Sequence, residues 1–285
     1  MKSISDVVKA CMVESIENGW LLSLPSETIN SSLYKKFSSE MKRIGGKWKT
    51  GKGFFFKENP EIALQAIEDE TVKNFSLKYH YFPTPKPVIE MVTEKLNLFD
   101  GVHILEPSAG RGAFMEAISD LIEEEDIRNA KLYYCEIDPY NDMYIKNNPK
   151  LKNWVKLSDD FLKASESVKF DIIVSNPPFK DVKNHLKKMF QLLNNRGNGA
   201  VSEIHAILPE NWAYRLEPTK CIPKKLYHES RSKINPFVPF YNLQEWDMFE
   251  DMVYLPEGTF RESGTSIGTV LATITAISNL YLNVA

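Results

Sequence analysis

The fold class follows from ten consecutive residues, Phe170-Asp171-Ile172-Ile173-Val174-Ser175-Asn176-Pro177-Pro178-Phe179. Their first part is short, apolar and rich in β-branched side chains, which predicts a buried strand. Two prolines then prevent a helix from continuing, because each lacks a backbone N–H and has a fixed φ. We therefore expect an open α/β sheet with Asn176 at the carboxyl end of a strand, where such sheets bind ligands.

The residues after this strand suit a planar amino group. The side-chain oxygen of Asn176 and the carbonyl oxygen of Pro177 are two acceptors in one rigid turn, so they can accept both hydrogens of an NH2 group. Phe179 adds a flat apolar face beside them. Asn-Pro-Pro also occurs in ordinary turns, so the other motifs have to decide between a turn and a site.

Asn176-Pro177-Pro178-Phe179 resembles the catalytic motif of S-adenosylmethionine-dependent amino-methyltransferases, above all those that act on N6 of adenine in DNA. The resemblance implies a Rossmann-like class I methyltransferase fold, which is a mostly parallel seven-stranded sheet with an antiparallel edge hairpin and helices on both faces. It implies S-adenosylmethionine as cofactor. It also makes Asn176, Pro177, Pro178 and Phe179 catalytic candidates, with Asn176 contacting the cofactor as well.

A loop of small residues follows an earlier predicted strand, in Val102-His103-Ile104-Leu105-Glu106-Pro107-Ser108-Ala109-Gly110-Arg111-Gly112-Ala113-Phe114. A strand, a tight loop and a helix in this order leave room for a cofactor and point backbone N–H groups at it. The dinucleotide fingerprint G-x-G-x-x-G is not met. The segment instead resembles motif I of the methyltransferases, which implies that Glu106 faces the cofactor's amino group. Further contacts are implied for Pro107, Ala109, Gly110 and Gly112.

Two more predicted strands end in acids. A carboxylate at the end of the strand over residues 131–135 can accept both ribose hydroxyls, so Glu136 is the candidate and Asp138 the alternative, with Ile137 packing on the adenine. After a third strand over residues 154–157, Asp160-Phe161 matches the pair that in the family binds the adenine amino group and lines its ring. Such a pair is otherwise a helix cap.

Residues 79–92 open with an aromatic, proline-rich loop. Thr84 is expected to cap a helix that has Pro85 at its first position. A helix N-terminus attracts a carboxylate, and the segment is similar to the Thr-Pro element that touches the methionine carboxylate in adenine methyltransferases. The resemblance thus adds Tyr81 and Thr84 to the cofactor site.

The composition is that of a soluble globular protein. The 285 residues are 43% hydrophobic, which suffices for a medium domain and a small appendage. The sequence has no apolar run of membrane-spanning length and no signal-peptide pattern, and Cys11, Cys135 and Cys221 are too scattered for a disulfide framework or a zinc site. We expect a cytoplasmic protein without a metal or a membrane partner.

The formal net charge is −3, but the charges are segregated. Residues 35–57 carry a local charge of +7, and residues 215–233 carry +4. These segments are either solvated surface or contacts for a polyanion.

Residues 1–75 are predicted to form a small α+β module. Helices are expected over residues 6–16, from Ser31 or Ser32 to Arg43 and over 60–67, with a strand over 20–25 and a hairpin over 47–56. Lysines interleaved with aromatic residues on that hairpin suit phosphates and stacked bases, although the aromatics could equally be the module's core. The nucleic-acid candidates are Lys47, Trp48, Lys49 and Lys52.

Residues 76–285 are assigned to the methyltransferase domain. A helix over 181–194 and a strand over 200–209 are predicted, and then an irregular, aromatic and basic insertion over 210–250. Strands over 252–255 and 266–274 are expected to form the edge hairpin. The further nucleic-acid candidates are Arg215, Lys224 and Lys225.

The motif order corresponds to the gamma group of adenine methyltransferases, which implies methylation of adenine N6 in DNA with the target base flipped out of the duplex. It suggests DNA modification of the restriction-modification or phage type. Enzymes of this group usually carry a large target-recognition domain after the catalytic domain; here we expect recognition to come instead from residues 1–75, from 210–250 or from a separate specificity subunit. Three alternatives stay open: an RNA adenine methyltransferase, a protein glutamine methyltransferase, and a non-catalytic cofactor-binding subunit.

Overall fold

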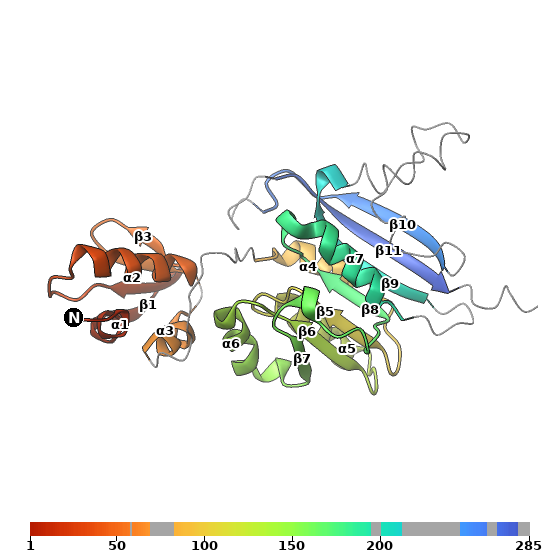
Figure 1. Cartoon of the computed structure of the whole chain (residues 1–285), viewed down its shortest axis with the longest axis horizontal. Helices are drawn as coiled ribbons and strands as arrows, with labels where there is room; N and C mark the ends of the chain where they lie inside the picture. The colour runs from red at the N-terminus through yellow and green to blue at the C-terminus, as the bar shows by residue number, and fades with distance from the viewer. Residues whose placement is uncertain (58, 69–82, 195–200, 213–245, 261–266, 279–285) are drawn as a thin grey trace, which may run out of the picture. The chain divides into compact units, whose positions relative to one another are not determined.

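The computed structural model describes residues 1–57, 59–68, 83–194, 201–212, 246–260 and 267–278 (Figure 1). Contacts among the residues divide the chain into two compact units. The first consists of Met1–His80 and Asp138–Asn147, and the second consists of Tyr81–Ile137 and Asn148–Ala285. Each unit has its own sheet.

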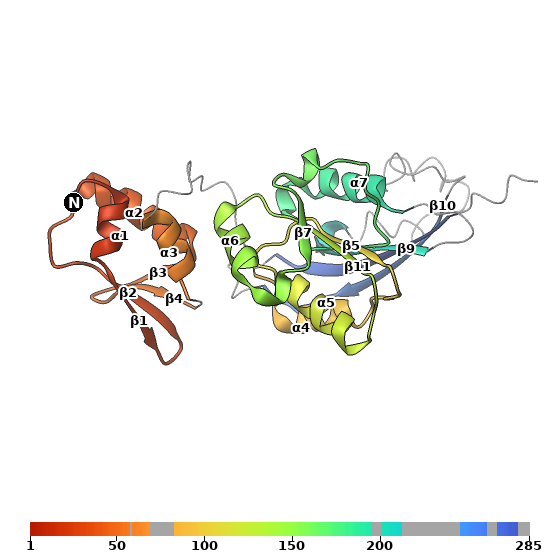
Figure 2. The same cartoon turned by 90° about the horizontal axis from the view of Figure 1, so that it is seen from below.

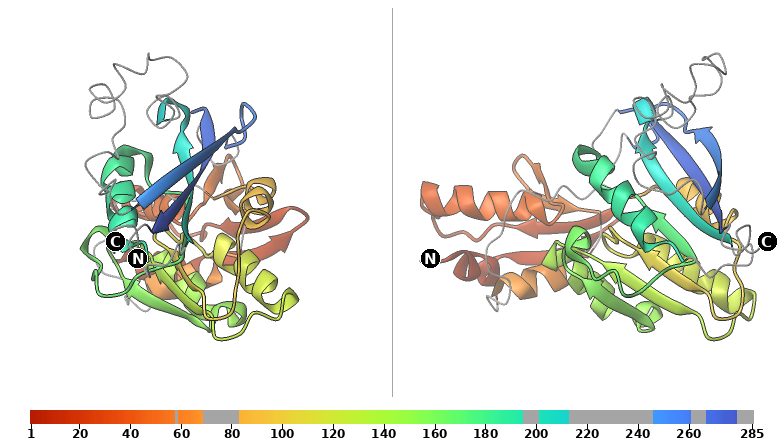
Figure 3. Two further views of the ribbon diagram at one scale, coloured as in Figure 1. Left: turned by 90° about the vertical axis from the view of Figure 1, so that its right-hand side faces the viewer. Right: turned by 45° about the vertical axis from the view of Figure 1, so that its right-hand side comes forward.

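The second unit is built on a seven-stranded sheet in the order β10-β11-β9-β8-β5-β6-β7. Strands β5 to β9 pair in parallel, whereas β11 is antiparallel to both of its neighbours. The sheet is twisted (Figure 3). The predicted mostly parallel sheet with an antiparallel edge hairpin is therefore confirmed. The strands are β5 His103–Glu106, β6 Lys131–Cys135, β7 Trp154–Ser158, β8 Ile172–Ser175, β9 Val201–Pro209, β10 Trp246–Tyr254 and β11 Thr269–Ser278.

Helices cover both faces of this sheet. α7 (Val182–Leu192) lies on one face, and α4 (Lys86–Thr93) and α5 (Ala113–Glu124) lie on the other (Figure 2). This is the Rossmann-like class I arrangement that the motifs imply. Among the described residues, no helix has both the length and the apolar surface needed to cross a bilayer. The short turns are η1 Pro149–Leu151, η2 Phe161–Lys163, η3 Phe179–Asp181 and η4 Glu210–Trp212.

The apolar run that predicted the fold is the centre of the sheet. All four residues of β8 are buried, and Ile173 and Val174 are 0% exposed. A β-branched run belongs in a strand that is covered on both faces, and each fully buried side chain contributes about 1.5–3 kcal/mol. Strands are added in one direction from β5 to β7 and in the other from β8 onward. The carboxyl ends of β5 and β8 therefore form the switch point at which such sheets bind ligands.

The first unit contains a four-stranded antiparallel sheet in the order β1-β2-β4-β3. Helices α1, α2 and α3 lie on one face of it (Figure 2), and its core includes Leu22, Phe37 and Phe54, each 0% exposed. The hairpin and the helix ending at Arg43 occur as predicted. The elements are α1 Ile4–Ala10, β1 Met12–Ile16, β2 Gly19–Ser23, α2 Ser31–Arg43, β3 Lys47–Lys49, β4 Gly53–Phe56 and α3 Glu61–Glu68.

Two predicted elements are wrong. The helix expected over residues 6–16 ends at Ala10, and Met12–Ile16 form β1, which pairs with β2. Asn18-Gly19 beside an alternating segment is a strong hairpin signal, and pairing in a sheet outweighs the helical spacing. The strand expected from residue 252 begins at Trp246, inside the supposedly irregular region, because β10 pairs with β11 along its whole length.

α6 (Pro139–Asn147) follows β6 in the sequence and belongs to the first unit by its contacts. The Arg43 guanidinium lies 3.3 Å from the Asp138 carboxylate, 3.1 Å from Glu40 and 3.7 Å from the centre of the Tyr140 ring. Burial raises the pKa of Glu40, and the charge of Arg43 opposes that shift. These buried groups hold the start of α6 to α2.

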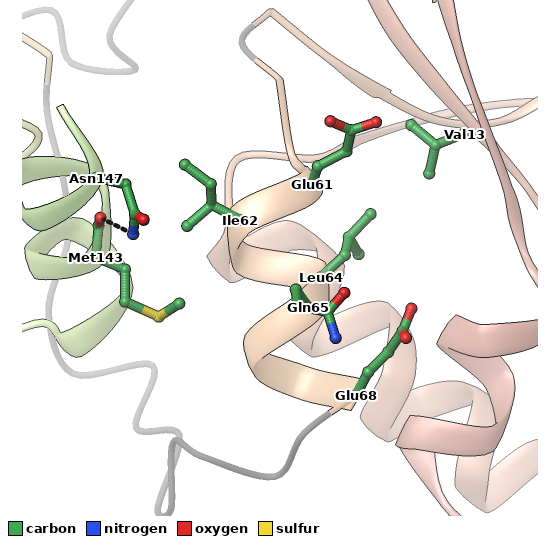
Figure 4. A pocket seen from close by; sticks show the side chains of 8 residues that line it. All are labelled: Val13, Glu61, Ile62, Leu64, Gln65, Glu68, Met143 and Asn147. Carbon is green, nitrogen blue, oxygen red and sulfur yellow. Dashed lines mark hydrogen bonds between the residues drawn. The ribbon is translucent and has the colours of Figure 1, made fainter. Parts of the chain in front are cut away.

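A hollow of about 580 Å³ also lies in the first unit, between β1, α3 and α6 (Figure 4). Glu61 and Glu68 are part of its lining, so it is unsuited to a phosphate-bearing ligand. None of the predicted site residues lines it. The lining residues are Val13, Glu61, Ile62, Leu64, Gln65, Glu68, Met143 and Asn147.

Candidate functional site

The catalytic candidate Asn176 is joined to the segment before α4. Its Nδ2 donates a hydrogen bond of 3.1 Å to Oγ1 of Thr84. Thr84 does not cap α4, because the cap position is Pro85 and no side chain makes a capping bond there. The predicted cap is therefore wrong. The Thr84 hydroxyl instead orients Asn176 at the end of β8.

The orientation of the Asn176 amide matters chemically. Since Nδ2 donates to Thr84, the amide's acceptor, Oδ1, is left out of this bond. The turn after it is closed by the Asp181 N–H, which donates to the carbonyl of Pro178 at 3.0 Å and leaves the Pro177 carbonyl out of that bond. Asn176 and Phe179 are half-buried, and Phe179 packs against the core of the sheet. The motif is thus fixed by packing against the core of the sheet, while part of its surface stays accessible to solvent.

The glycine loop after β5 has the backbone that only glycine adopts easily. Gly110 has φ 56° and Gly112 has φ 89°, both in the left-handed region. The loop is tied to the end of β6 by the Ala109 N–H, which donates to the Cys135 carbonyl at 3.0 Å. α5 then starts at Ala113 with Gly112 as its cap. The predicted strand, loop and helix are confirmed.

The structure brings the glycine loop and Glu136 together. The Gly110 N–H donates to Oε2 of Glu136 across 2.6 Å, and the Glu136 side chain is buried. Ile137, the next residue, is 38% exposed, so its apolar side chain is accessible to a flat ligand. Asp138, the alternative to Glu136, is engaged by Arg43 and by the Tyr140 N–H. Both acids thus already accept hydrogen bonds, and the assignment of Glu136 to the ribose stays a prediction.

Glu106 is a buried carboxylate at the end of β5. It is 1% exposed, and its Oε2 has no hydrogen-bond partner among the described residues. Burial, and secondarily the charge of Glu136, raise its pKa well above the ordinary value. A buried acceptor without a partner is costly unless a ligand supplies one. The cofactor's ammonium group would be such a partner, so these residues fit S-adenosylmethionine.

Asp160 and Phe161 both have structural roles. Oδ1 of Asp160 accepts from the Leu162 N–H at 3.1 Å, which caps η2, and Oδ2 lies 3.2 Å from the Lys163 ammonium. Phe161 is 3% exposed and its ring lies 5.4 Å from that of His185. Their assignment to the cofactor's adenine stays a prediction.

The sequence reasoning missed one candidate site residue. Ser175, directly before Asn176, is fully buried, and its Oγ has no hydrogen-bond partner among the described residues. A serine at the end of an otherwise apolar strand was the available signal.

Pro107 and Ala109, two predicted cofactor contacts in the loop after β5, are buried. In the part of the chain that the structure describes, no group of three acidic, histidine or cysteine side chains could hold a metal ion.

The remaining predicted site residues are not part of the group described above. Tyr81, Arg215, Lys224 and Lys225 fall outside the described residues, as does most of the insertion over 210–250. Lys47, Trp48, Lys49 and Lys52 belong to the first unit and are all exposed.

Comparison with known proteins agrees with this geometry. The model of the N-6 DNA methylase family matches residues 69–203, which include the glycine loop, Glu136 and the Asn-Pro-Pro-Phe motif. The Type II methyltransferase M.CvrRI of Paramecium bursaria Chlorella virus XZ-6E is 30% identical over 157 residues. That alignment covers 53% of this chain and 39% of the viral protein.

Two solved structures share the fold. The first is the Type I restriction enzyme EcoKI M protein, with a TM-score of 0.50 and 13% identity over 76% of this chain and 51% of that one. The second is a modification subunit of a proposed type I restriction enzyme from Vibrio vulnificus YJ016, with a TM-score of 0.50 and 17% identity over 88% of this chain and 51% of that one. The second unit thus has the class I methyltransferase fold, with S-adenosylmethionine as its cofactor, and residues 69–203 of the chain match the N-6 DNA methylase family.

Proposed function

We propose that the protein transfers the methyl group of S-adenosylmethionine to N6 of adenine in DNA. The observation that carries this proposal is the hydrogen bond from Asn176 to Thr84, which presents the amide of the Asn-Pro-Pro-Phe motif with its oxygen available to an amine. The family match and the viral Type II relative support DNA as the substrate.

The motif residues then act on the substrate amine. The nitrogen is a poor nucleophile because its lone pair is delocalised into the ring. Asn176 Oδ1 and the Pro177 carbonyl accept its two hydrogens and localise the pair toward the methyl carbon. Pro178 keeps the turn rigid, and Phe179 receives one face of the base. One proton leaves the nitrogen for solvent when the new bond has formed, and the rate comes from positioning and electrostatics.

The cofactor is assigned to the residues around the glycine loop. Bound S-adenosylmethionine supplies an electrophilic methyl group on a sulfonium centre. Glu106 would hold its ammonium group, Glu136 its ribose hydroxyls, and Ile137 would cover its adenine ring. Because Glu136 already accepts from the Gly110 N–H, it also fixes the loop that surrounds the methionine part.

In duplex DNA the adenine has to leave the stack before it reaches Asn176, at a cost of a few kcal/mol. Phe179 would offset part of this cost by stacking on the extruded base. We therefore expect mismatched or unpaired adenines to react faster than paired ones.

Transfer of tritiated methyl groups to DNA tests the proposal, with RNA of the same sequence as the second substrate. Digestion to nucleosides and mass spectrometry would identify the product. We expect N6-methyladenine from DNA, and no label with Asn176→Ala although that variant still binds the cofactor in calorimetry. Label confined to RNA or to protein glutamine, or wild-type rates with Asn176→Ala, would refute the assignment.

A further inference from the structure

The sheet of the first unit has one face covered by helices and one open face. Side chains alternate between the two faces, so the register assigns each residue to one of them. Leu22, Phe54 and Phe56 are buried among α1, α2 and α3, and these helices lie on one side of the sheet (Figure 2). Leu21 and Phe55, which pair with each other, therefore lie on the opposite face and are only half-buried.

This alternation separates the hairpin's lysines from its tryptophan. Trp48 pairs with Phe54 on the helix side, and its ring lies 5.1 Å from that of Phe54 and 6.4 Å from that of Tyr34 on α2. Trp48 is 42% exposed, but its contacts are with the core. Lys47 pairs with Phe55 on the open face. The aromatic ring on the same face as Lys47 and Lys49 is thus Phe55, whereas Trp48 lies on the other face.

The Phe55 ring is positioned between the lysines and a glycine. The Lys49 ammonium lies 3.9 Å above the ring centre. A Cβ added at Gly19 would come within 2.9 Å of two ring atoms, so the glycine makes room for the ring to lie on β2. Lys47, Lys49 and Lys52 are exposed around it, and residues 47–57 contain four lysines and no acid. The ring of Phe55 is therefore bordered by lysines on the β3 side, whereas Glu14, which pairs with Leu21 on the same face, lies at the β1 edge.

We infer that this open face, defined by Leu21, Phe55, Lys47, Lys49 and Lys52, binds an unpaired segment of DNA. An exposed sheet face with an aromatic ring and surrounding cations suits single strands, whose bases stack on the ring while the lysines contact phosphates. Stacking of a base is worth more than a solvent-exposed contact between a cation and a ring, so the Lys49 ammonium can leave Phe55 for a phosphate.

That the bound nucleic acid is DNA rests on the proposed function, whereas the argument that this face binds a nucleic acid does not. The charge of +7 on residues 35–57, in a chain whose net charge is −3, supplies the attraction for a polyanion. Because α2 carries part of that charge on the other side of the unit, Lys35, Lys36 and Lys42 provide a matched control. They are exposed, and replacing them changes the net charge by the same amount.

Fluorescence anisotropy of the full chain with a labelled single-stranded DNA, without cofactor, tests the inference. We expect the triple variant K47Q/K49Q/K52Q to bind at least tenfold more weakly and to lower the slope of log affinity against log salt by about 2. The control variant K35Q/K36Q/K42Q should lose much less affinity for the single-stranded DNA. Phe55→Leu should cost about tenfold, and Phe55→Trp should restore binding, since the effect requires an aromatic face.

Equal losses for the two lysine triples, or no loss for Phe55→Leu when circular dichroism shows it folded, would overturn the inference. So would tighter binding to a matched duplex, or to RNA of the same sequence. A wild-type chain that binds single-stranded DNA through this face but methylates no DNA would refute only the proposed function, and the converse result would refute only this inference.

Discussion

Asn176 and Thr84 are joined by a hydrogen bond of 3.1 Å although they are 92 positions apart in the sequence. In this bond Nδ2 of Asn176 donates to the Thr84 hydroxyl, so Oδ1 of the amide stays available as an acceptor. Thr84, two residues before α4, therefore helps to hold the amide of the Asn-Pro-Pro-Phe motif in this orientation.

Replacing Thr84 by Val should slow methyl transfer roughly tenfold, because the amide then loses its orienting partner, a bond worth about 1 kcal/mol. The expected change is in kcat, with a smaller change in the KM for DNA. Single-turnover kinetics with labelled cofactor measure it. Thr84→Ser, which keeps the hydroxyl, should retain most of the rate, and an equally slow serine variant would argue against the orienting role.

Gly110→Ala should weaken cofactor binding. A non-glycine residue at φ 56° costs about 1–2 kcal/mol, and strain in the loop also disturbs the N–H that donates to Glu136. Gly101→Ala is the matched control, since Gly101 has φ 78° and open space around it. Both variants should lose similar stability in urea denaturation, but only Gly110→Ala should raise the Kd for S-adenosylmethionine in calorimetry.

The raised pKa of Glu106 predicts a specific dependence of stability on pH. Above the pKa of an unfolded glutamate, about 4.3, the folded protein keeps a proton that the unfolded chain releases. This contribution is present at low pH and is lost as the pH rises through the folded pKa, at up to about 1.4 kcal/mol per pH unit.

Glu106→Gln cannot ionise, so wild-type stability relative to this variant should fall between pH 5 and pH 8. Urea denaturation without cofactor at both pH values gives the difference. A difference that stays constant across this range would mean that Glu106 is already ionised in the folded protein.

Arg43→Ala should destabilise the first unit by about 3–5 kcal/mol, because it leaves buried Asp138 and Glu40 without their cation. Hydrogen exchange of the backbone amides of α2, β2 and β4 in urea follows the unfolding of this unit by itself, whereas tryptophan fluorescence would also report Trp154 of the second unit. Lys42→Ala, at the exposed neighbouring position, should change stability by less than about 0.5 kcal/mol. Similar losses for the two variants would show that the ionic cluster contributes little.

The sequence predicted the features that depend on local pattern. The strands that end at Glu106, Cys135 and Ser175 are recognisable because each is a largely apolar run followed by residues that end it. Parallel strands carry their carboxyl ends to one edge, which brings those residues toward one another. The seven-stranded sheet itself was predicted from the resemblance of these motifs to the class I methyltransferases.

Other features depend on contacts that no local pattern encodes. The Thr84 hydroxyl was free to cap α4 or to bind Asn176, and only the packing of α4 against the sheet decides between them. The division of the 47–56 hairpin between two faces depends on the side that α2 covers, so Trp48 could not be told from Phe55. Asp160 satisfies the cap pattern and the family pattern at once.

The first unit is discontinuous along the chain, because Asp138–Asn147 belongs to it while lying between two strands of the catalytic sheet. Deleting residues 1–80 would leave Tyr140, Met143 and Tyr144 of α6 without their apolar surroundings. Gene fusion or domain shuffling with a boundary at residues 80 and 81 would thus separate α6 from its neighbours. We expect the two parts to be inherited together, and a fragment starting at residue 81 to aggregate.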